Sequence, residues 1–199
     1  MNETIRFFSP AKGFTAALRL MARQAFSDAF AHMYDPVPFK QFLEEAYGPQ
    51  GKMERDFADP SIRWRVAAID DQPIGYAKLS PLVAPAPAPQ PGAMELRQIY
   101  VLQQWRGRGV AEELINWAID TARAEGAPEI YLTVFDHNMR AKRFYTRHGF
   151  SEVGHCTFRL GDRVQLYEPL DPHNVFRQTR SSSTRPPSLK VQCPTSEKP

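Results

Sequence analysis

Two glycines alternate with two arginines in the stretch WRGRGVA, residues 105–111, directly before a helical pattern of apolar residues. Glycine lets the main chain approach a ligand closely, and the first N–H groups of a helix point outward at the positive end of its dipole. The guanidinium groups of Arg106 and Arg108 add charged donors that suit a diphosphate. The stretch predicts either a phosphate site or a plain basic surface turn, and its surroundings must decide between them.

Two well-known phosphate motifs do not fit this stretch. The dinucleotide fingerprint G-x-G-x-x-G requires a third glycine where Glu112 stands. The nucleotide P-loop requires Gly-Lys-Ser or Gly-Lys-Thr at the start of its helix, and neither triplet is present here. A glycine turn followed by a helix N-terminus is the geometry that remains.

The segment MELRQIYVL, residues 94–102, precedes the turn and is expected to be a strand. Its apolar positions are Met94 and Leu96, then Ile99 and Val101. The parity therefore slips by one residue, as an inserted bulge residue would produce. A bulge would bend the strand away from its neighbour and leave main-chain groups unpaired, opening a slot for an extended ligand beside the turn.

The elements that would position these residues alternate along the chain. Apolar spacing predicts helices at residues 14–32, 39–47, 52–57, 108–125 and 141–148. Strands are expected at residues 3–8, 63–70, 73–80, 94–102, 129–135, 150–158 and 164–170. A tight Asp-Gln turn makes a first hairpin, LGDR makes a second, and the proline-rich residues 81–93 form a long loop. This order indicates a mixed α/β single domain.

The end of the chain differs in composition from the rest. With 199 residues the chain suits one domain. Residues 172–199 are rich in Ser, Thr, Pro and Arg with few large apolar residues, so we expect a disordered basic tail after a domain at residues 1–171. The tail holds five basic residues and one acid, which leaves a charge of about −1 on residues 1–171. Nucleic acid is therefore not the expected partner, because such binders usually carry the basic surplus on the domain.

Cysteine and histidine positions argue against a metal or a disulfide framework. Cys156 and Cys193 stand alone, and neither His137 nor His155 has metal-ligand spacing with a partner. No apolar run approaches the ~18 residues of a membrane span, and the first residues lack the pattern of a secretion signal. We expect a reduced, cytoplasmic protein with neither metal nor membrane partner.

The strand end IYV, the turn RGRGVA, Asn138 and the run AKRFYTRHGF together resemble the GNAT superfamily of acetyl-CoA-dependent N-acetyltransferases. The family signature Q/R-x-x-G-x-G/A is matched by Arg106, Gly109 and Ala111, and again by Gln104, Gly107 and Gly109. The resemblance spans roughly residues 3–171. It implies an α/β, single-domain GNAT-like fold, in which helices flank a mixed, mostly antiparallel central sheet with splayed central strands.

The resemblance also implies a cosubstrate, acetyl-CoA, and residues that bind it. Ile99, Tyr100 and Val101 would line its pantetheine arm, with the Val101 N–H near the thioester carbonyl. Asn138 would contact the cofactor, and Tyr145 would lie beside the sulfur. The pyrophosphate would be held by the Arg106 side chain and by the N–H groups of Gly107, Arg108, Gly109, Val110, Ala111 and Glu112.

Acetyl transfer from a thioester to an amine needs a neutral amine, a stabilised oxyanion and a proton for the thiolate. A main-chain N–H freed by the bulge could bind the oxyanion, and the Tyr145 phenol, with an ordinary pKa of ~10 against ~8.5 for a thiol, could supply the proton. Glu95 could deprotonate the amine, directly or through water. The open alternatives are an aromatic packed beside Phe144 for Tyr145 and a solvated carboxylate for Glu95.

The acceptor is expected to be a small primary amine. In this family the acceptor enters between the N-terminal helices and the last hairpin. The acidic and aromatic residues of those helices are Asp28, Asp35, Glu44, Glu45, Phe26, Phe30, Tyr34 and Phe39. Such a mouth suits a cationic amine, and ELRQIYVLQQ and FRLGDRVQ look similar to the bacterial polyamine acetyltransferase branch.

Two other functions stay open, as does the assembly of the chain. One is acetylation of a protein N-terminus or lysine, although Thr133 stands where the branch that modifies ribosomal proteins commonly has a glutamate. The other is a non-catalytic module that binds acyl-CoA. Exposed strands at the last hairpin could support a homodimer.

Overall fold

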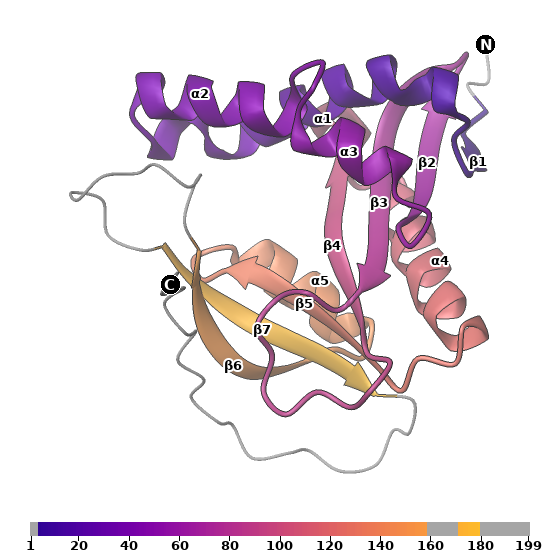
Figure 1. Ribbon diagram of the computed structural model, residues 1–199, viewed down its shortest axis with the longest axis vertical. Helices are drawn as coiled ribbons and strands as arrows, with labels where there is room; N and C mark the ends of the chain where they lie inside the picture. Colours follow the sequence, from indigo (N-terminus) through magenta and orange to yellow (C-terminus); the bar gives the residue numbers. More distant parts are fainter. Residues whose placement is uncertain (1–3, 159–170, 180–199) are drawn as a thin grey trace. The chain divides into compact units, whose positions relative to one another are not determined.

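The computed structural model describes residues 4–158 and 171–179, and Figure 1 shows their arrangement. The helices are α1 (Thr15–Phe30), α2 (Pro36–Tyr47), α3 (Lys52–Ala58), α4 (Val110–Ala124) and α5 (Met139–Arg147). The strands are β1 (Arg6–Phe8), β2 (Arg63–Ile69), β3 (Gln72–Pro81), β4 (Met94–Val101), β5 (Glu129–Phe135), β6 (Ser151–Phe158) and β7 (Asp171–Thr179). The predicted order of elements is confirmed from β1 to β6.

The strands form one seven-stranded sheet in the order β1-β2-β3-β4-β5-β7-β6. The pairs β1–β2, β2–β3, β5–β7 and β6–β7 are antiparallel, and β4–β5 is parallel. The sheet is therefore mixed and mostly antiparallel, as predicted. The β4–β5 pairing covers Met94 and Glu95, the first two residues of β4. Splaying of the two strands beyond this point stays a prediction.

Contacts divide the chain into two compact units that share β4 and α4. The first unit comprises the residues up to Ser80 together with Leu96–Asp120, and the second comprises Pro81–Glu95 and the residues from Thr121 onward. No helix in the described part of the chain is long and apolar enough to cross a membrane.

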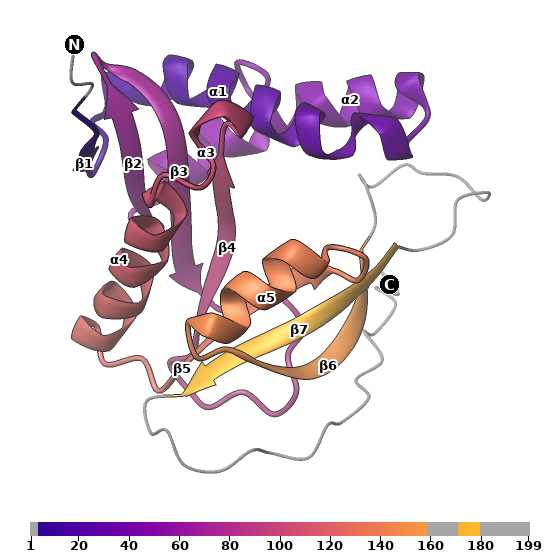
Figure 2. The same ribbon diagram turned by 180° about the vertical axis from the view of Figure 1, so that it is seen from behind.

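In the first unit, α3 and α4 cover opposite faces of the strands β2 to β4 (Figures 1 and 2). Gly75 allows close packing on the α4 face, because a Cβ there would lie 3.0 Å from the Tyr100 carbonyl oxygen and 3.2 Å from Val101 and Val110 side chains. Leu114, one turn further along α4, has no exposed surface. The end of β4 and the start of α4 are thus fixed against β3.

A two-residue turn joins β2 to β3. Ile69 pairs with Gln72, and the intervening Asp70 and Asp71 have φ values of 47° and 63°. Positive φ at both central residues matches the twist of a two-stranded hairpin, and aspartate tolerates that conformation better than most side chains. The hairpin is confirmed, with its turn one residue earlier than predicted.

In the second unit, α5 covers one face of the strands β5, β7 and β6, and the proline-rich loop covers the other (Figures 1 and 2). Beneath the loop lies a cluster of buried residues, with Leu82 and Ala86 of the loop packed against it: Ala93, Tyr131, Val153, Cys156 and Val175. The loop ends are joined by a hydrogen bond of 3.1 Å from the Leu82 N–H to the Ala93 carbonyl oxygen. The loop thus covers this sheet face as a helix would.

The last strand differs from the sequence prediction. We predicted a strand at residues 164–170, which lies outside the described residues, and disorder from residue 172. Instead, Asp171–Thr179 form β7, which pairs with both β5 and β6. Val175 and Phe176 are buried, and the two neighbouring strands satisfy the main-chain hydrogen-bonding groups of β7. Two adjacent apolar residues among polar ones were too weak a pattern for a strand prediction. The prediction of disorder is therefore wrong for residues 172–179; residues 180–199 lie outside the described part.

Candidate functional site

The turn before α4 is exposed and is shaped by its two glycines. Gly107 and Gly109 have φ values of +77° and +79°, in the left-handed region that other residues rarely adopt. A Cβ at either position would meet nothing within 4 Å. Main-chain conformation, rather than lack of space, therefore explains the glycines here.

The main-chain N–H groups at the start of α4 point away from the helix. The N–H of Glu113 donates to the Gly109 carbonyl oxygen at 3.1 Å, so the N–H groups before Glu113 precede the hydrogen-bonded ladder of the helix. The helix itself is held firmly, because Val110 and Leu114 are at most 1% exposed. The sequence predicted this arrangement of turn and helix; that it binds a diphosphate stays a prediction.

Each arginine of the turn is held by a neighbouring group. The Nε of Arg106 donates to the Val101 carbonyl oxygen at 3.3 Å, which ties the side chain to the end of β4. The guanidinium carbon of Arg108 lies 4.7 Å from the centre of the Trp105 ring, within cation–π distance. Both arginines are exposed, so their charge is available at the surface of the turn.

The predicted pantetheine residues of β4 differ in burial. Val101 is buried, whereas Ile99 and Tyr100 are partly buried. The Tyr100 ring lies 6.1 Å from Phe26 of α1 and 5.9 Å from Tyr76 of β3. Tyr100 therefore also packs the helix α1 onto the sheet.

Contacts of the two preceding residues support the predicted bulge in β4. The Gln98 side chain accepts a hydrogen bond of 3.0 Å from the Tyr76 hydroxyl, and Arg97 lies 3.8 Å from Asp56 of α3. Tyr76 and Lys78 share one face of β3, and Lys78 also contacts Asp56. Consecutive strand residues ordinarily point to opposite faces, so two neighbours that reach the same face favour an inserted residue here.

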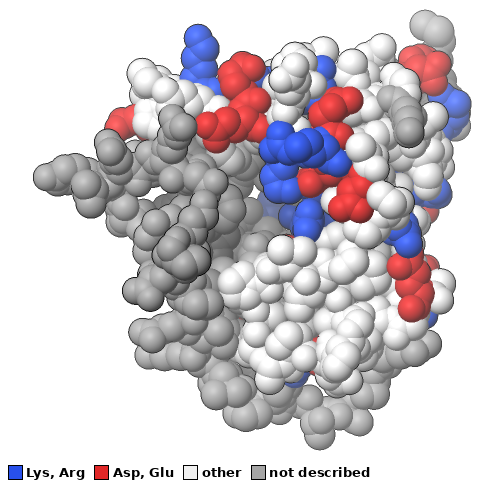
Figure 3. Space-filling model, viewed as in Figure 1, with Lys and Arg blue, Asp and Glu red and all other residues white. Residues whose placement is uncertain are grey.

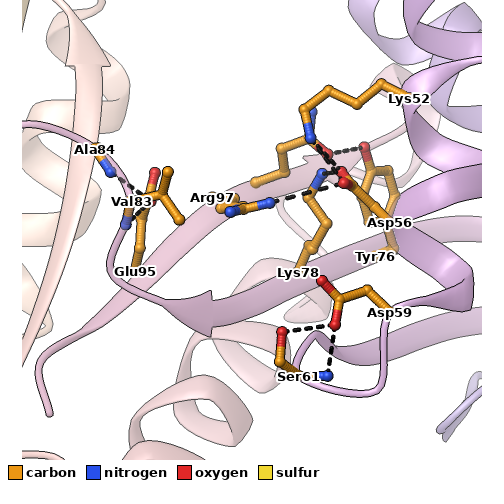
Figure 4. Close-up of polar contacts among 11 residues, drawn as sticks. Lys52, Asp56, Asp59, Ser61, Tyr76, Lys78, Val83, Ala84, Glu95 and Arg97 are labelled. Atoms are coloured by element: carbon orange, nitrogen blue, oxygen red, sulfur yellow. Dashed lines mark hydrogen bonds and ion pairs between the residues drawn. The ribbon is translucent and has the colours of Figure 1, made fainter.

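Glu95 fastens the proline-rich loop. Its Oε2 accepts hydrogen bonds from the main-chain N–H groups of Val83 at 3.1 Å and Ala84 at 3.0 Å (Figure 4). The sequence suggested only a base or a solvated carboxylate and missed this contact, since nothing local marks a loop that folds back. The role of Glu95 as a base stays a prediction.

Asn138 and Tyr145 belong to the second unit. The Asn138 Oδ1 accepts a hydrogen bond of 3.0 Å from the Ala141 N–H and so caps the start of α5. Tyr145 lies partly buried, with its ring 5.3 Å from Phe144 and 5.9 Å from Phe150. Burial raises the pKa of the Tyr145 phenol well above its ordinary value, so it stays protonated but gives up its proton less readily than the sequence suggested.

The acidic residues predicted for the acceptor mouth are partly engaged within the helices. Asp28 accepts a hydrogen bond of 2.6 Å from Gln24, and Glu44 pairs with Arg23 at 2.6 Å. The aromatic residues of this region pack on one another around Phe26 and Phe39, including Phe30 and Tyr34. Asp35 and Glu45 are exposed.

A buried ionic cluster that the sequence did not reveal joins α3 to β3 and β4; we call Lys52, Asp56, Lys78 and Arg97 the Asp56 cluster (Figure 4). Asp56 lies 2.8 Å from the Lys78 Nζ and 2.7 Å from the Lys52 Nζ. The side chains of Asp56 and Lys78 are 9% and 6% exposed. The one available signal was a lysine inside the otherwise apolar run PIGYAKLS.

The electrostatics of the Asp56 cluster follow from its burial and its cations. The pKa of Lys78 is lowered to about 8, mainly by burial and also by repulsion from Lys52 and Arg97, while the attraction of Asp56 opposes this shift. Burial raises the pKa of Asp56, but Lys78 and Lys52 outweigh this and hold it below its ordinary value. In the described residues, no three His, Cys, Asp or Glu side chains gather as metal ligands.

Comparison with known proteins identifies relatives of the chain. The model of the acetyltransferase (GNAT) family matches residues 21–150. An uncharacterized N-acetyltransferase in the pepI 3′ region of Lactobacillus delbrueckii subsp. lactis is 28% identical over 145 residues, which is 73% of this chain and 83% of the relative. An uncharacterized N-acetyltransferase of Mycobacterium tuberculosis is 35% identical over 103 residues, which is 52% of this chain and 62% of that protein.

Solved structures share the fold. The PaiA N-acetyltransferase of Thermoplasma acidophilum, crystallised in complex with coenzyme A, superposes with a TM-score of 0.67 at 18% identity and covers 88% of this chain and 99% of its own. An N-acetyltransferase of Staphylococcus aureus superposes with a TM-score of 0.65 at 18% identity. The match covers 88% of this chain and 98% of that protein. At this identity the likeness concerns the fold.

Proposed function

The chain belongs to the acetyltransferase (GNAT) family, whose cosubstrate is acetyl-CoA, and from this premise we propose that it transfers the acetyl group to the primary amine of a small acceptor by direct attack. The observation that carries the proposal is the exposed turn at residues 106–109. Its left-handed glycines, two arginines and outward N–H groups would hold the diphosphate of the cosubstrate. Coenzyme A would then extend along Ile99, Tyr100 and Val101.

Within this proposal Tyr145 protonates the departing thiolate. Its raised pKa keeps the phenol protonated across the neutral and moderately alkaline range, so the donor is available at every working pH. Asn138 would contact the cofactor through the part of its amide that does not cap α5. Glu95 would accept the amine proton, directly or through water, while its Oε2 holds the proline-rich loop.

The sequence predicted two classes of acceptor, a polyamine-like amine and a protein amine, and one assay can compare them. A spermine/spermidine N(1)-acetyltransferase of Bacillus subtilis is 28% identical over 78 residues, 39% of this chain and 51% of the relative, which lends polyamines limited support. The case for a polyamine is weakened because Asp28 and Glu44 already contact Gln24 and Arg23 of α1. A protein N-terminus or lysine is the other class.

The test is thiol release from acetyl-CoA with a panel of amines. We expect release with a small amine, and a fall of about 100-fold in kcat for Tyr145→Phe with unchanged affinity for acetyl-CoA, because general acid catalysis contributes about 10²–10⁴-fold. Tyr131→Phe is the control, since the Tyr131 hydroxyl donates to Glu129 at 2.9 Å and Tyr131 is not itself one of the predicted site residues. Binding of acetyl-CoA without release for any amine would instead indicate a non-catalytic module.

A further inference from the structure

The ammonium group of Lys78 has more hydrogen-bond donors than the described residues use. It carries three N–H donors, and among the described residues Asp56 is its one hydrogen-bond acceptor, at 2.8 Å. The Trp64 ring faces the Nζ at 5.3 Å. The side chain is only 6% exposed, and a buried ammonium is costly unless its donors are satisfied. The group is thus suited to a further acceptor.

Three cations converge on one carboxylate in the Asp56 cluster (Figure 4). The Asp56 Oδ1 lies 2.7 Å from Lys52 and 3.8 Å from Arg97, and its Oδ2 lies 2.8 Å from Lys78. Repulsion from Lys52 and Arg97 contributes to the low pKa of Lys78. A bound oxyanion would relieve this repulsion, because an opposite charge favours the protonated lysine.

The cluster is open to solvent at one edge. The side chains of Arg97 and Lys52 are 18% and 59% exposed, in contrast to the buried Asp56 and Lys78. Figure 3 shows basic and acidic side chains gathered together on this face of the molecule. A small charged group could therefore reach the buried ammonium past Arg97.

One member of the cluster, Arg97, lies on β4, the strand that is proposed to carry the cosubstrate. Arg97 stands two residues before Ile99 and four residues before Val101. Along a strand, four residues span about 13 Å, which is the distance from Arg97 to Val101. A small acceptor with its amine at the thioester and a charged group at its other end could span this distance.

We propose that Lys78 and Arg97 bind an oxyanion, either a carboxylate or a phosphonate, carried by the acceptor amine, and that Asp56 orients Lys78 for this contact. The proposal rests on the proposed function, since it names the acceptor class of the same transfer. It replaces the polyamine-like acceptor with an amine that bears an acid. Charge-assisted hydrogen bonds from arginine and lysine are the contacts that recognise such groups.

The test compares an ω-aminoalkanoate, its carboxamide of equal length, an aminoalkylphosphonate and spermidine as acceptors. We expect kcat/KM to be at least about 10-fold higher for the acids than for the carboxamide. Arg97→Gln should lower kcat/KM for the acids about 10- to 100-fold, mainly through KM, because a hydrogen bond between charged groups contributes that much. The carboxamide should be almost unaffected, and Arg97→Lys should restore part of the loss.

A matched control and a second variant separate recognition from folding. Arg177→Gln is the control, because Arg177 is 17% exposed and pairs with the buried Glu129 at 3.1 Å, much as Arg97 faces Asp56. It should leave the acid preference intact. Lys78→Met should abolish the preference while the carboxamide is still turned over, which shows that the variant is folded.

Three outcomes overturn the proposal: equal use of acid and carboxamide, preference for spermidine, or an equal loss for both acceptors in the Arg97 and Lys78 variants. If the wild type releases no thiol with any amine, the proposed function has failed, and calorimetry then tests the oxyanion site separately. Heat on adding the ω-aminoalkanoate to protein saturated with coenzyme A, but not on adding the carboxamide, would support the site. No heat with the acid would overturn it.

Discussion

The glycine turn at residues 106–109 and the Asp56 cluster both belong to the first unit, and both present positive charge by opposite means. The turn is exposed and uses main-chain N–H groups together with two surface arginines. The cluster has the buried pair of Asp56 and Lys78 at its centre and uses side-chain charges arranged around one carboxylate. The turn requires a particular main-chain conformation, whereas the cluster requires that its charges be compensated.

This difference separates binding from stability. An exposed turn can lose hydrogen-bond donors with little effect on the stability of the fold, because its remaining polar groups still hydrogen-bond to water. A buried cation cannot lose its counter-charge so cheaply, since the remaining charge stays out of water. Substitutions in the two regions should therefore change different measured quantities.

The largest effect is expected for Asp56→Asn. The substitution keeps the shape of the side chain but leaves the Lys78 ammonium buried without its carboxylate. We expect the free energy of unfolding, measured with urea, to fall by about 3 kcal/mol, with unchanged affinity for acetyl-CoA. The control is Asp71→Asn, which breaks an exposed ion pair with Arg6. This substitution should change the free energy of unfolding by less than about 1 kcal/mol. Equal losses for the two variants would contradict the comparison.

An intermediate effect is expected for Gly109→Val. A β-branched residue resists the left-handed φ of +79°, so the turn should relax to another conformation. We expect the affinity for acetyl-CoA, measured by calorimetry, to fall about 10- to 100-fold. Gly126→Val is the matched control, because Gly126 has the same φ of +79° and equally open surroundings at the end of α4. Both variants should lose similar stability, and a similar loss of affinity in the control would refute the diphosphate site.

The smallest effect concerns pH. The pKa of Lys78 is about 8 in the folded chain, below its ordinary value of 10.5. Between pH 8 and pH 10.5 the unfolded chain binds more protons at Lys78 than the folded chain does. The free energy of unfolding of the wild type should therefore rise with pH relative to that of Lys78→Met. We expect the difference in unfolding free energy to change by about 1 kcal/mol between pH 8 and pH 9. A difference independent of pH would mean that Lys78 keeps an ordinary pKa.

Sequence patterns predicted most elements of the fold because their signals are local. The helix α4 showed apolar spacing, two glycines before it and Gly126 after it, and it begins and ends within two residues of the prediction. The strand β7 was missed because Val175 and Phe176 are its only large apolar residues, and its two partner strands are distant in sequence. Predictions made from local periodicity fail where neighbouring strands supply the stabilisation.

The candidate site was predicted in the same uneven way. The turn residues Arg106, Gly107 and Gly109 could be named because residue type alone restricts their main-chain conformation. Glu95 was noticed for its chemistry, but its hydrogen bonds to the loop residues Val83 and Ala84 could not be foreseen. Its partners lie 11 and 12 residues away on a loop without regular structure.

The sequence by itself determined the glycine turn and the helix behind it, since φ preferences and apolar spacing act between near neighbours. Only the tertiary structure decided that Lys78, inside an apolar strand, meets Asp56 from a helix 22 residues earlier, and that Arg97 of the next strand approaches the same carboxylate. Charges at such separations become neighbours only when the sheet and α3 pack together, and burial then makes their compensation decisive for stability.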